Sequence, residues 1–401
     1  MSLDGPATNP YKQIVQSTAR KRRLLSAQWE LTYRCNERCT HCYLDVFAPN
    51  AKVPGELTTD ECFRVVDELA AEGVLHLTLT GGEVFTRRDF FDIARYARQK
   101  RFLLRLFTNG ILVNPRLADR IADLHPYAVE LSVYAVDAET HEAITLVPRS
   151  FELTMRALRL LRERGVRTVM KTPLMRENVR QLDALRALAE ELGAQFRYDI
   201  TITPKDNGGL SPLKHRLTYD DLLWLFRETI SLDTFAPSPG TPDQRTCGIA
   251  LNGLLVDPYG TVYPCVQTRM PAGNVRQQSL GEIWQNSPVW KELGNLTLGE
   301  LPVCGTCELR TICVRCHGLA LVEDDDLRGP AYINCREALA RREVLIEKGG
   351  LPADYPIPAH LQNYRGAARR SPPTLPLPDH FVPLAAVSGG LSQPVGSTIL
   401  M

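Results

Sequence analysis

The stretch Gln28-Trp-Glu-Leu-Thr-Tyr-Arg-Cys35-Asn-Glu-Arg-Cys39-Thr-His-Cys42 places three cysteines in one short loop directly after an apolar segment. This spacing lets three thiolates bind three irons of one cubane cluster. Iron-sulfur clusters in proteins usually take four cysteines, so a loop with three leaves one iron open to a small ligand. A zinc site or an accidental group of thiols is the alternative interpretation.

The segment from Ser26 to about Ile230 alternates short β-branched runs with amphipathic helical stretches, which predicts a repeated βα pattern. The apolar content of the runs predicts strands buried on both faces of a parallel sheet. The six predicted strands are Gln28–Arg34, Val74–Thr80, Phe102–Thr108, Ala128–Tyr134, Thr168–Leu174 and Phe196–Ile202. Such a repeat can close partway into a barrel or stay an open doubly wound sheet.

Unusual residues follow or end these strands, and their positions favour the barrel. They are the Cys35 loop, Gly81-Gly82-Glu83, Thr108-Asn109-Gly110, Ser132, Lys171 and Lys205, in strand order. In a barrel, chemistry gathers at the rim formed by the carboxyl ends of the strands. The predicted fold is therefore α/β, a partial (β/α)6 barrel of the TIM type.

Composition excludes several classes of protein. Of the 401 residues, 44% are hydrophobic and 23% charged, which excludes a fibrous or wholly disordered chain. The net charge of +1 gives no overall attraction for nucleic acid or membrane, although Arg20 to Arg23 form a local basic patch. There is no apolar signal segment or transmembrane-length run, so we expect a cytoplasmic protein without nucleic-acid or membrane partners.

Seven of the eleven cysteines form a second group between Cys247 and Cys335. A reducing compartment argues against disulfides, so metal or redox chemistry is expected. The paired spacings in Cys304-Gly-Thr-Cys307 and Cys313-Val-Arg-Cys316 also suit a zinc ribbon, which is the serious competitor. Cys62 stands alone in a helical, apolar context and is expected to be a small core residue.

These patterns divide the chain into five predicted parts. Residues 1–24 form an N-terminal extension, 25–230 the barrel, 231–246 a linker rich in Pro, Ser and Thr, 247–348 a cysteine-rich module and 349–401 a Pro- and Gly-rich tail. The tail is expected to be extended or partly disordered.

The CX3CX2C loop after a first strand, with His41 before its last cysteine, resembles the signature of the radical S-adenosylmethionine (SAM) superfamily. The resemblance implies that Cys35, Cys39 and Cys42 hold a catalytic [4Fe-4S] cluster that binds SAM and cleaves it to a 5′-deoxyadenosyl radical. It also implies cofactor-binding roles for residues at the strand ends. Gly81, Gly82 and Glu83 would meet the amino group of SAM, and Ser132 and Lys171 would line the same site.

The second group of cysteines resembles the SPASM domain, a radical SAM extension that holds two auxiliary iron-sulfur clusters. Two features match its pattern: Gly260, which four intervening residues separate from Cys265, and the segment Leu280-Gly-Glu-Ile-Trp284. By this resemblance, auxiliary cluster I would take Cys247, Cys265 and Cys316, and auxiliary cluster II would take Cys304, Cys307, Cys313 and Cys335. Seven thiolates are one short of two Cys₄ cubanes, so auxiliary cluster I is expected to have an open or non-cysteine position, or to be smaller.

Segments around Phe107, Leu131 and His141 look most like maturases of ribosomally made peptides. The resemblance implies oxidative modification of a peptide substrate by a C-C or thioether crosslink or a dehydrogenation, with a reductant such as flavodoxin or ferredoxin. The alternatives are an anaerobic sulfatase-type maturase, a cofactor-pathway enzyme related to heme synthesis, and a non-catalytic zinc-binding module.

Two features of the predicted maturase stay open. About twenty-five residues precede the first strand, too few for a leader-binding winged-helix domain. A separate leader-peptide-binding protein, the barrel or the tail would then recognise the leader. Asp199, Lys205 and Asp206 lie near the end of the sixth strand, where they are either a catalytic base or ordinary surface charges.

Overall fold

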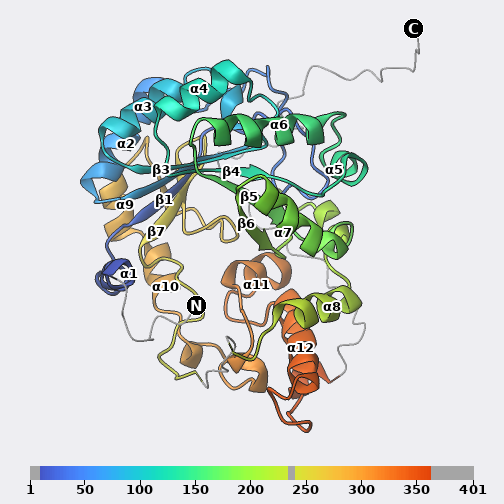
Figure 1. The fold of residues 1–401 in the computed structure, drawn as a ribbon. Helices are drawn as coiled ribbons and strands as arrows, with labels where there is room; N and C mark the ends of the chain where they lie inside the picture. Colours follow the sequence, from blue (N-terminus) through green and yellow to red (C-terminus); the bar gives the residue numbers. More distant parts are fainter. Residues whose placement is uncertain (1–9, 234–239, 363–401) are drawn as a thin grey trace, which may run out of the picture.

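The computed structural model describes residues 10–233 and 240–362 (Figure 1). The start of the predicted N-terminal extension, part of the predicted linker and residues 363–401 of the predicted tail lie outside the described residues. Within the described ranges, no helix is both long and apolar enough to cross a membrane.

Six parallel strands run side by side in chain order, which confirms the predicted α/β repeat. They are β1 (Ser26–Glu30), β2 (His76–Thr80), β3 (Leu103–Thr108), β4 (Ala128–Ser132), β5 (Thr168–Pro173) and β6 (Gln195–Asp199). The helices of this part are α1 (Pro10–Lys21), α2 (Thr59–Ala71), α3 (Phe90–Gln99), α4 (Pro115–Asp123), α5 (Ala138–Thr145), α6 (Ser150–Glu163), α7 (Leu182–Glu191) and α8 (Tyr219–Thr229). Figure 1 shows α2, α3, α4 and α6 along the outer side of the curved sheet.

The cysteine-rich module shares this sheet. Strand β7 (Gly253–Val256) pairs in parallel with β1, and β8 (Thr261–Tyr263) and β9 (Gly273–Asn274) extend the sheet in antiparallel fashion. The two predicted modules are therefore joined by backbone hydrogen bonds at the β1 edge, in a sheet of nine strands among the described residues.

Four helices complete the second module: α9 (Leu280–Asn286), α10 (Pro288–Gly294), α11 (His317–Asp324) and α12 (Tyr332–Glu347). The first part of the predicted tail packs against this module. Leu361 is buried, and the Tyr355 hydroxyl donates to the Glu308 carbonyl at 2.8 Å. The second module as folded thus extends beyond residue 348, to at least Leu361.

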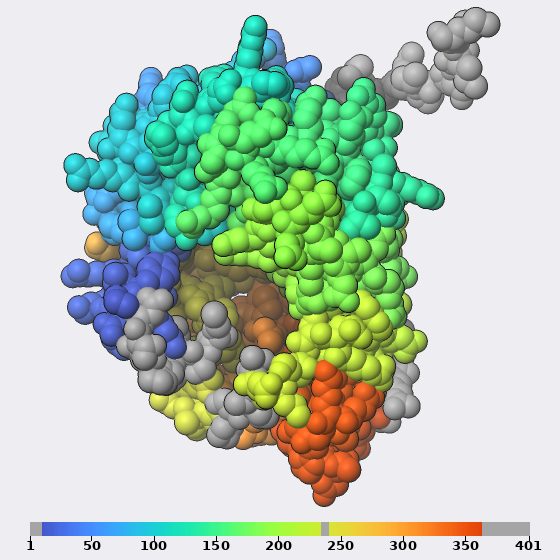
Figure 2. Space-filling view, viewed as in Figure 1, coloured from blue at the N-terminus to red at the C-terminus, as the bar shows by residue number. Residues whose placement is uncertain are grey.

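The prediction that the strands are buried on both faces holds for β4 but not for the sheet as a whole. Leu104, Leu106 and Met170 on the outer face are fully buried against the helices, and Cys62 lies in the same core as predicted. The inner face is polar, and four of the five residues of β6 are exposed. Its charged members Arg105, Glu130, Lys171 and Arg197 alternate with the outer apolar residues. A partly closed barrel does not fill its interior with aliphatic side chains, and Figure 2 shows the molecule hollowed at the centre of this face.

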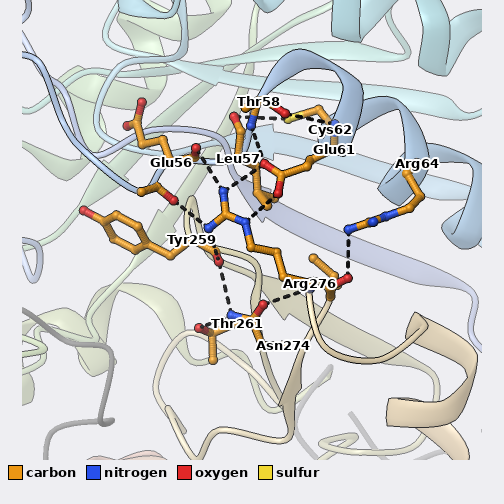
Figure 3. Close-up of polar contacts among 12 residues, drawn as sticks. Glu56, Leu57, Thr58, Glu61, Cys62, Arg64, Tyr259, Thr261, Asn274 and Arg276 are labelled. Carbon is orange, nitrogen blue, oxygen red and sulfur yellow. Dashed lines mark hydrogen bonds and ion pairs between the residues drawn. The ribbon is translucent and has the colours of Figure 1, made fainter.

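Arg276, just after β9, ties the second module to the start of α2 on the outside of the molecule (Figure 3). Its guanidinium binds Glu61 in bidentate fashion, at 2.6 Å and 2.8 Å, and donates to the Gly55 carbonyl at 2.8 Å. Glu61 also closes the capping box of α2 with Thr58. A helix start and an interdomain contact are thus stabilised by one carboxylate.

Candidate iron-sulfur and SAM site

The Cys35 loop begins where β1 ends. The Cys35 amide donates to the Phe47 carbonyl at 2.9 Å, and the Cys42 amide donates to the Cys39 carbonyl at 3.0 Å, so the loop folds back on itself. All three thiols are free and mostly shielded from water. Burial raises the pKa of Cys35 to about 12 and that of Cys42 to about 11. The thiols are therefore protonated in the metal-free protein, and a bound metal must displace these protons.

The two glycines after β2 are required for close approach of this turn to the cysteine loop. A Cβ at Gly81, which has φ +148°, would lie 2.3 Å from the Thr32 carbonyl oxygen. A Cβ at Gly82 would lie 2.4 Å from the Arg34 carbonyl oxygen and 3.0 Å from the Cβ of Cys35. The predicted role of these glycines was approach to a ligand, and the structure shows that they first allow approach to the chain that carries Cys35.

Glu83 is fully buried and faces the end of β3. Its carboxylate accepts from the Thr108 hydroxyl at 2.8 and 2.9 Å, the Asn109 amide at 2.8 Å and the Phe85 amide at 3.1 Å. Burial raises its pKa to about 7, against the lowering effect of these donors. Glu83 thus joins two rim loops in this structure, and its contact with the amino group of SAM stays a prediction.

Ser132 and Lys171 are directly paired in the register of β4 and β5. The side chain of Ser132 contacts the Tyr134 hydroxyl, which itself lies 3.6 Å from the Cys39 sulfur. Lys171 instead has its ammonium 3.5 Å from Glu130 and 3.8 Å from the centre of the Phe107 ring. Both residues face the interior, where Ser132 is connected to the cysteine loop through Tyr134 and Lys171 has a carboxylate partner.

Two residues beside the cysteines were not predicted. Glu37 lies within the loop, 2% exposed, with one carboxylate oxygen 3.1 Å from the Cys39 sulfur. Burial raises its pKa to about 8. Tyr134, beyond β4, packs edge-on against His41 of the loop. Glu37 lies between Cys35 and Cys39 in the sequence, although no spacing rule marks it, whereas Tyr134 meets the loop only through the fold.

The later cysteines gather into two groups. The thiols of Cys265 and Cys316 lie close enough to Cys247 for their charges to interact. The second group joins four thiols, those of Cys304, Cys307, Cys313 and Cys335. The two groups have the membership that the resemblance implied. All seven cysteines are free, and all but the exposed Cys247 are at least partly buried, which suits donors for iron-sulfur clusters.

These groups are neighbouring thiols and not formed coordination shells. Within residues 10–233 and 240–362, no three His, Cys, Asp or Glu side chains could hold a single metal ion as they stand. In the three-thiol group, the Gln267 amide oxygen lies 3.2 Å from the Cys265 sulfur. His317, next to Cys316, has both ring nitrogens within hydrogen-bond distance of other partners, Thr246 and Arg315.

A buried charge cluster lies between the two modules, and we call it the Glu30 cluster. It consists of Glu30, Arg269, Tyr33 and Tyr43. The Arg269 guanidinium lies 2.7 Å from Glu30 and donates to the Tyr33 hydroxyl at 3.0 Å. The hydroxyls of Tyr43 and Tyr33 donate to the two Glu30 oxygens at 2.7 and 2.9 Å. One carboxylate thus balances one guanidinium, with every oxygen of Glu30 occupied.

The Glu30 cluster connects two cysteine loops. Tyr43 directly follows Cys42, and Arg269 lies four residues after Cys265. A few hydrogen bonds therefore hold the first cysteine loop against the loop that carries Cys265. The sequence signal for the Glu30 cluster was a glutamate inside a strand that was expected to be buried.

Of the candidate bases, Asp206 is the most shielded. Its backbone amide donates to the Tyr43 carbonyl at 2.8 Å, and burial raises its pKa to about 6. Lys205 is ion-paired with Asp45, and Asp199 accepts from the Thr201 amide at 2.7 Å. The structure thus brings Asp206 to the cysteine loop, while Asp199 stays exposed on β6.

Comparison with known proteins agrees with this arrangement of thiols and strands. The family model of the radical SAM superfamily matches residues 29–189, and that of an iron-sulfur cluster-binding domain, SPASM, matches residues 247–308. An AdoMet-dependent heme synthase of Methanosarcina barkeri is 30% identical over 74% of this chain and 92% of its own length. The chain belongs to the radical SAM superfamily.

The chain is also similar to a second curated protein and to a solved structure. The mycofactocin maturase MftC of Mycobacterium ulcerans is 30% identical over 85% of this chain and 88% of its own length. The fold resembles that of Streptococcus suis SuiB bound to precursor peptide SuiA, with a TM-score of 0.60, 15% identity and coverage of 82% of this chain and 81% of SuiB.

As a radical SAM enzyme with a SPASM domain, the protein uses a [4Fe-4S] cluster that binds SAM together with auxiliary iron-sulfur clusters. Membership of this family favours iron-sulfur clusters over zinc for both cysteine groups. It also favours an enzyme over a non-catalytic zinc-binding module. The partial barrel and the C-terminal iron-sulfur domain predicted from the sequence are confirmed.

Proposed function

We propose that this radical SAM enzyme oxidatively modifies a peptide in the maturation of a ribosomally made product, by a C-C or thioether crosslink or a dehydrogenation. The observation that supports it most is the Glu30 cluster, which holds the first cysteine loop beside the loop of an auxiliary group. A two-electron oxidation of substrate needs a route for its second electron, and adjacent clusters offer one. The similarity to a mycofactocin maturase and to SuiB, solved with a precursor peptide, supports the peptide.

When bound, the cluster and SAM supply a deoxyadenosyl radical that can remove hydrogen from an unactivated carbon. We propose that Cys35, Cys39 and Cys42 hold this cluster, and that Gly81, Gly82, Glu83, Ser132 and Lys171 surround SAM. The task of the barrel is to place one C-H bond at that position and to exclude water. Asp206, shielded and beside Tyr43, is our candidate for the group that accepts a proton from the substrate.

The seven later cysteines are assigned as their grouping suggests. Auxiliary cluster I would use Cys247, Cys265 and Cys316 and keep an open or non-cysteine position, and auxiliary cluster II would use the other four. Spectroscopy of a variant without Cys35, Cys39 and Cys42 tests this. It should cleave no SAM but retain auxiliary iron, and two fully cysteine-ligated cubanes would contradict the open position.

The substrate test begins with the genes next to the gene for this protein. A short open reading frame among them would encode a candidate peptide substrate. Co-expression with that peptide should lower its mass by two hydrogens. An unchanged mass leaves epimerisation to be checked by chiral amino-acid analysis. No chemical change despite active SAM cleavage would overturn this pairing of enzyme and peptide.

A cofactor-pathway reaction is the second candidate, because the heme synthase is as similar in sequence as the maturase. Substrate-dependent SAM cleavage with heme precursors but not with peptides would favour it. For the peptide reaction we further propose a cytoplasmic location, electron supply by flavodoxin or ferredoxin and a separate leader-binding protein. We propose residues 25–230 as the catalytic unit and residues 247–348 as the auxiliary unit, on which the following segment packs as far as Leu361.

A further inference from the structure

The inner face of the barrel carries a second charge cluster, which we call the Glu130 cluster. It consists of Glu130 on β4, Arg105 on β3, Lys171 on β5 and Arg197 on β6. Lys171 and Arg197 are paired in register, and Glu130 lies two residues before Ser132, the register partner of Lys171. Since side chains alternate along a strand, all four face the interior.

This cluster has more positive than negative charge. Glu130, 3% exposed, is hydrogen-bonded to Arg105, while Lys171 and Arg197 lie farther from it, at 3.5 and 3.8 Å. In the described part of the chain, no other carboxylate lies within ion-pair distance of these three cations. One carboxylate cannot neutralise three cations, although the exposed Asp199 contributes a weaker field at Lys171.

The cations are also open to solvent. The side chains of Arg197 and Lys171 are 54% and 39% exposed, although they lie on the concave face of the sheet. Figure 2 shows the hollow that this face surrounds. A concave site with excess positive charge concentrates anions, and a guanidinium fork suits the two oxygens of a carboxylate. The ring of Phe107, 3.8 Å from the Lys171 ammonium, adds an apolar wall.

We propose that Arg105 and Arg197 bind a carboxylate of the substrate inside the barrel, beside Lys171, whose charge adds to theirs. This inference rests on the proposed function, in which the substrate is a peptide. The carboxylate is then either the C-terminal group or the side chain of an Asp or Glu near the modified carbon. Binding there holds the neighbouring residues beside Ser132 and the first cysteine loop, where hydrogen removal is expected.

Arg197→Gln is the best test, because Arg197 is exposed and its loss leaves the Arg105 hydrogen bond to Glu130 in place. The full-length, cluster-loaded enzyme is assayed with its peptide as the free acid, as the C-terminal amide, and with each nearby Asp or Glu changed to Asn or Gln. In the unaltered enzyme, one neutralised peptide should show a KM raised about tenfold, from the loss of a charged hydrogen bond. The neutralised peptide that shows the raised KM is the one that has lost the bound carboxylate.

In R197Q the KM for the acidic peptide should rise by a similar factor, whereas the KM for the neutral peptide should barely change. R186Q is the matched control, since Arg186 on α7 is exposed and its ion-pair partner among the described residues is the exposed Asp183. Its KM values should match those of the unaltered enzyme. Iron content and circular dichroism confirm that each variant is folded.

Three results would overturn the inference. The unaltered enzyme could bind acidic and neutral peptides equally, or R197Q could raise the KM of both equally. R197Q could also weaken binding of SAM and leave peptide KM unchanged, in which case the cations serve the carboxylate of SAM. In all three the peptide is still modified, so the proposed function stands. A failure of the proposed function differs, because the unaltered enzyme then modifies no peptide.

Discussion

The Glu30 cluster and the Glu130 cluster both place a buried carboxylate on the inner face of the sheet, but their charges are matched differently. Glu30 has one guanidinium and two tyrosine hydroxyls, all within 3 Å of its oxygens. Glu130 has three cations, of which one is hydrogen-bonded and two are partly exposed.

The difference separates a structural role from a binding role. The Glu30 carboxylate already has a donor at both oxygens, which leaves it little capacity for another ligand, and the two bonds from Arg269 link the barrel to the second module. An open cluster with excess charge is only partly satisfied by the protein. We therefore expect the Glu30 cluster to contribute mainly to stability and cluster placement, and the Glu130 cluster mainly to substrate affinity.

The largest expected effect follows from breaking the closed cluster. Arg269→Met leaves the buried Glu30 without its cation, so the free energy of unfolding should fall by about 3–5 kcal/mol. Chemical denaturation of the anaerobic protein measures this. The electron paramagnetic resonance signals of the clusters should also change, because the Cys265 loop loses its anchor.

The double variant E30Q/R269M is the control for that result. Removing both charges avoids the unpaired carboxylate, so most of the lost stability should return. If R269M were as stable as the unaltered protein, the cluster would not hold the two modules together.

Glu130→Gln should destabilise the protein less than Arg269→Met does. Its effect on the KM for an acidic peptide should be opposite to that of Arg197→Gln. The cations it leaves are partly hydrated, so we expect a loss of about 1–2 kcal/mol in the free energy of unfolding. Because the competing carboxylate is gone, the KM for an acidic peptide should fall severalfold. An unchanged or higher KM, with iron content intact, would show that the open cluster does not receive an anion.

The smallest effect is expected at the exposed pair of Arg276 and Glu61, which is balanced like the Glu30 cluster but lies at the surface (Figure 3). The hydrogen bond from Arg276 lowers the pKa of Glu61 to about 2. The folded pKa lies below the unfolded value near 4.3, so the stabilisation is complete above about pH 4.3 and is lost as the pH falls toward 2.

Arg276→Gln should therefore cost up to about 1 kcal/mol at pH 7, because solvent screens the pair, and less below pH 4. Thermal unfolding of the metal-free protein at pH 7 and pH 3 compares the two. An equal loss at both pH values would mean that Arg276 acts through its hydrogen bonds to backbone carbonyls and not through its charge.

The sequence by itself determined the parts of this protein that depend on local spacing. The three-cysteine loop, the glycines after the second strand and the six βα repeats follow from short patterns whose geometry is set by neighbouring residues. The membership of the two later cysteine groups followed from a family pattern, and the structure brings the same thiols together.

Only the tertiary structure decided which polar side chains meet. Glu30 and Arg269 are far apart in the chain, and their contact exists because β7 pairs with β1. The place of Lys171 beside SAM stays a prediction, and only the structure shows that its ammonium lies 3.5 Å from Glu130, because strand register decides which side chains are neighbours on the inner face. The sequence shows that a charged side chain lies in a strand predicted to be buried. Contacts between distant segments decide which side chain becomes its ion-pair partner.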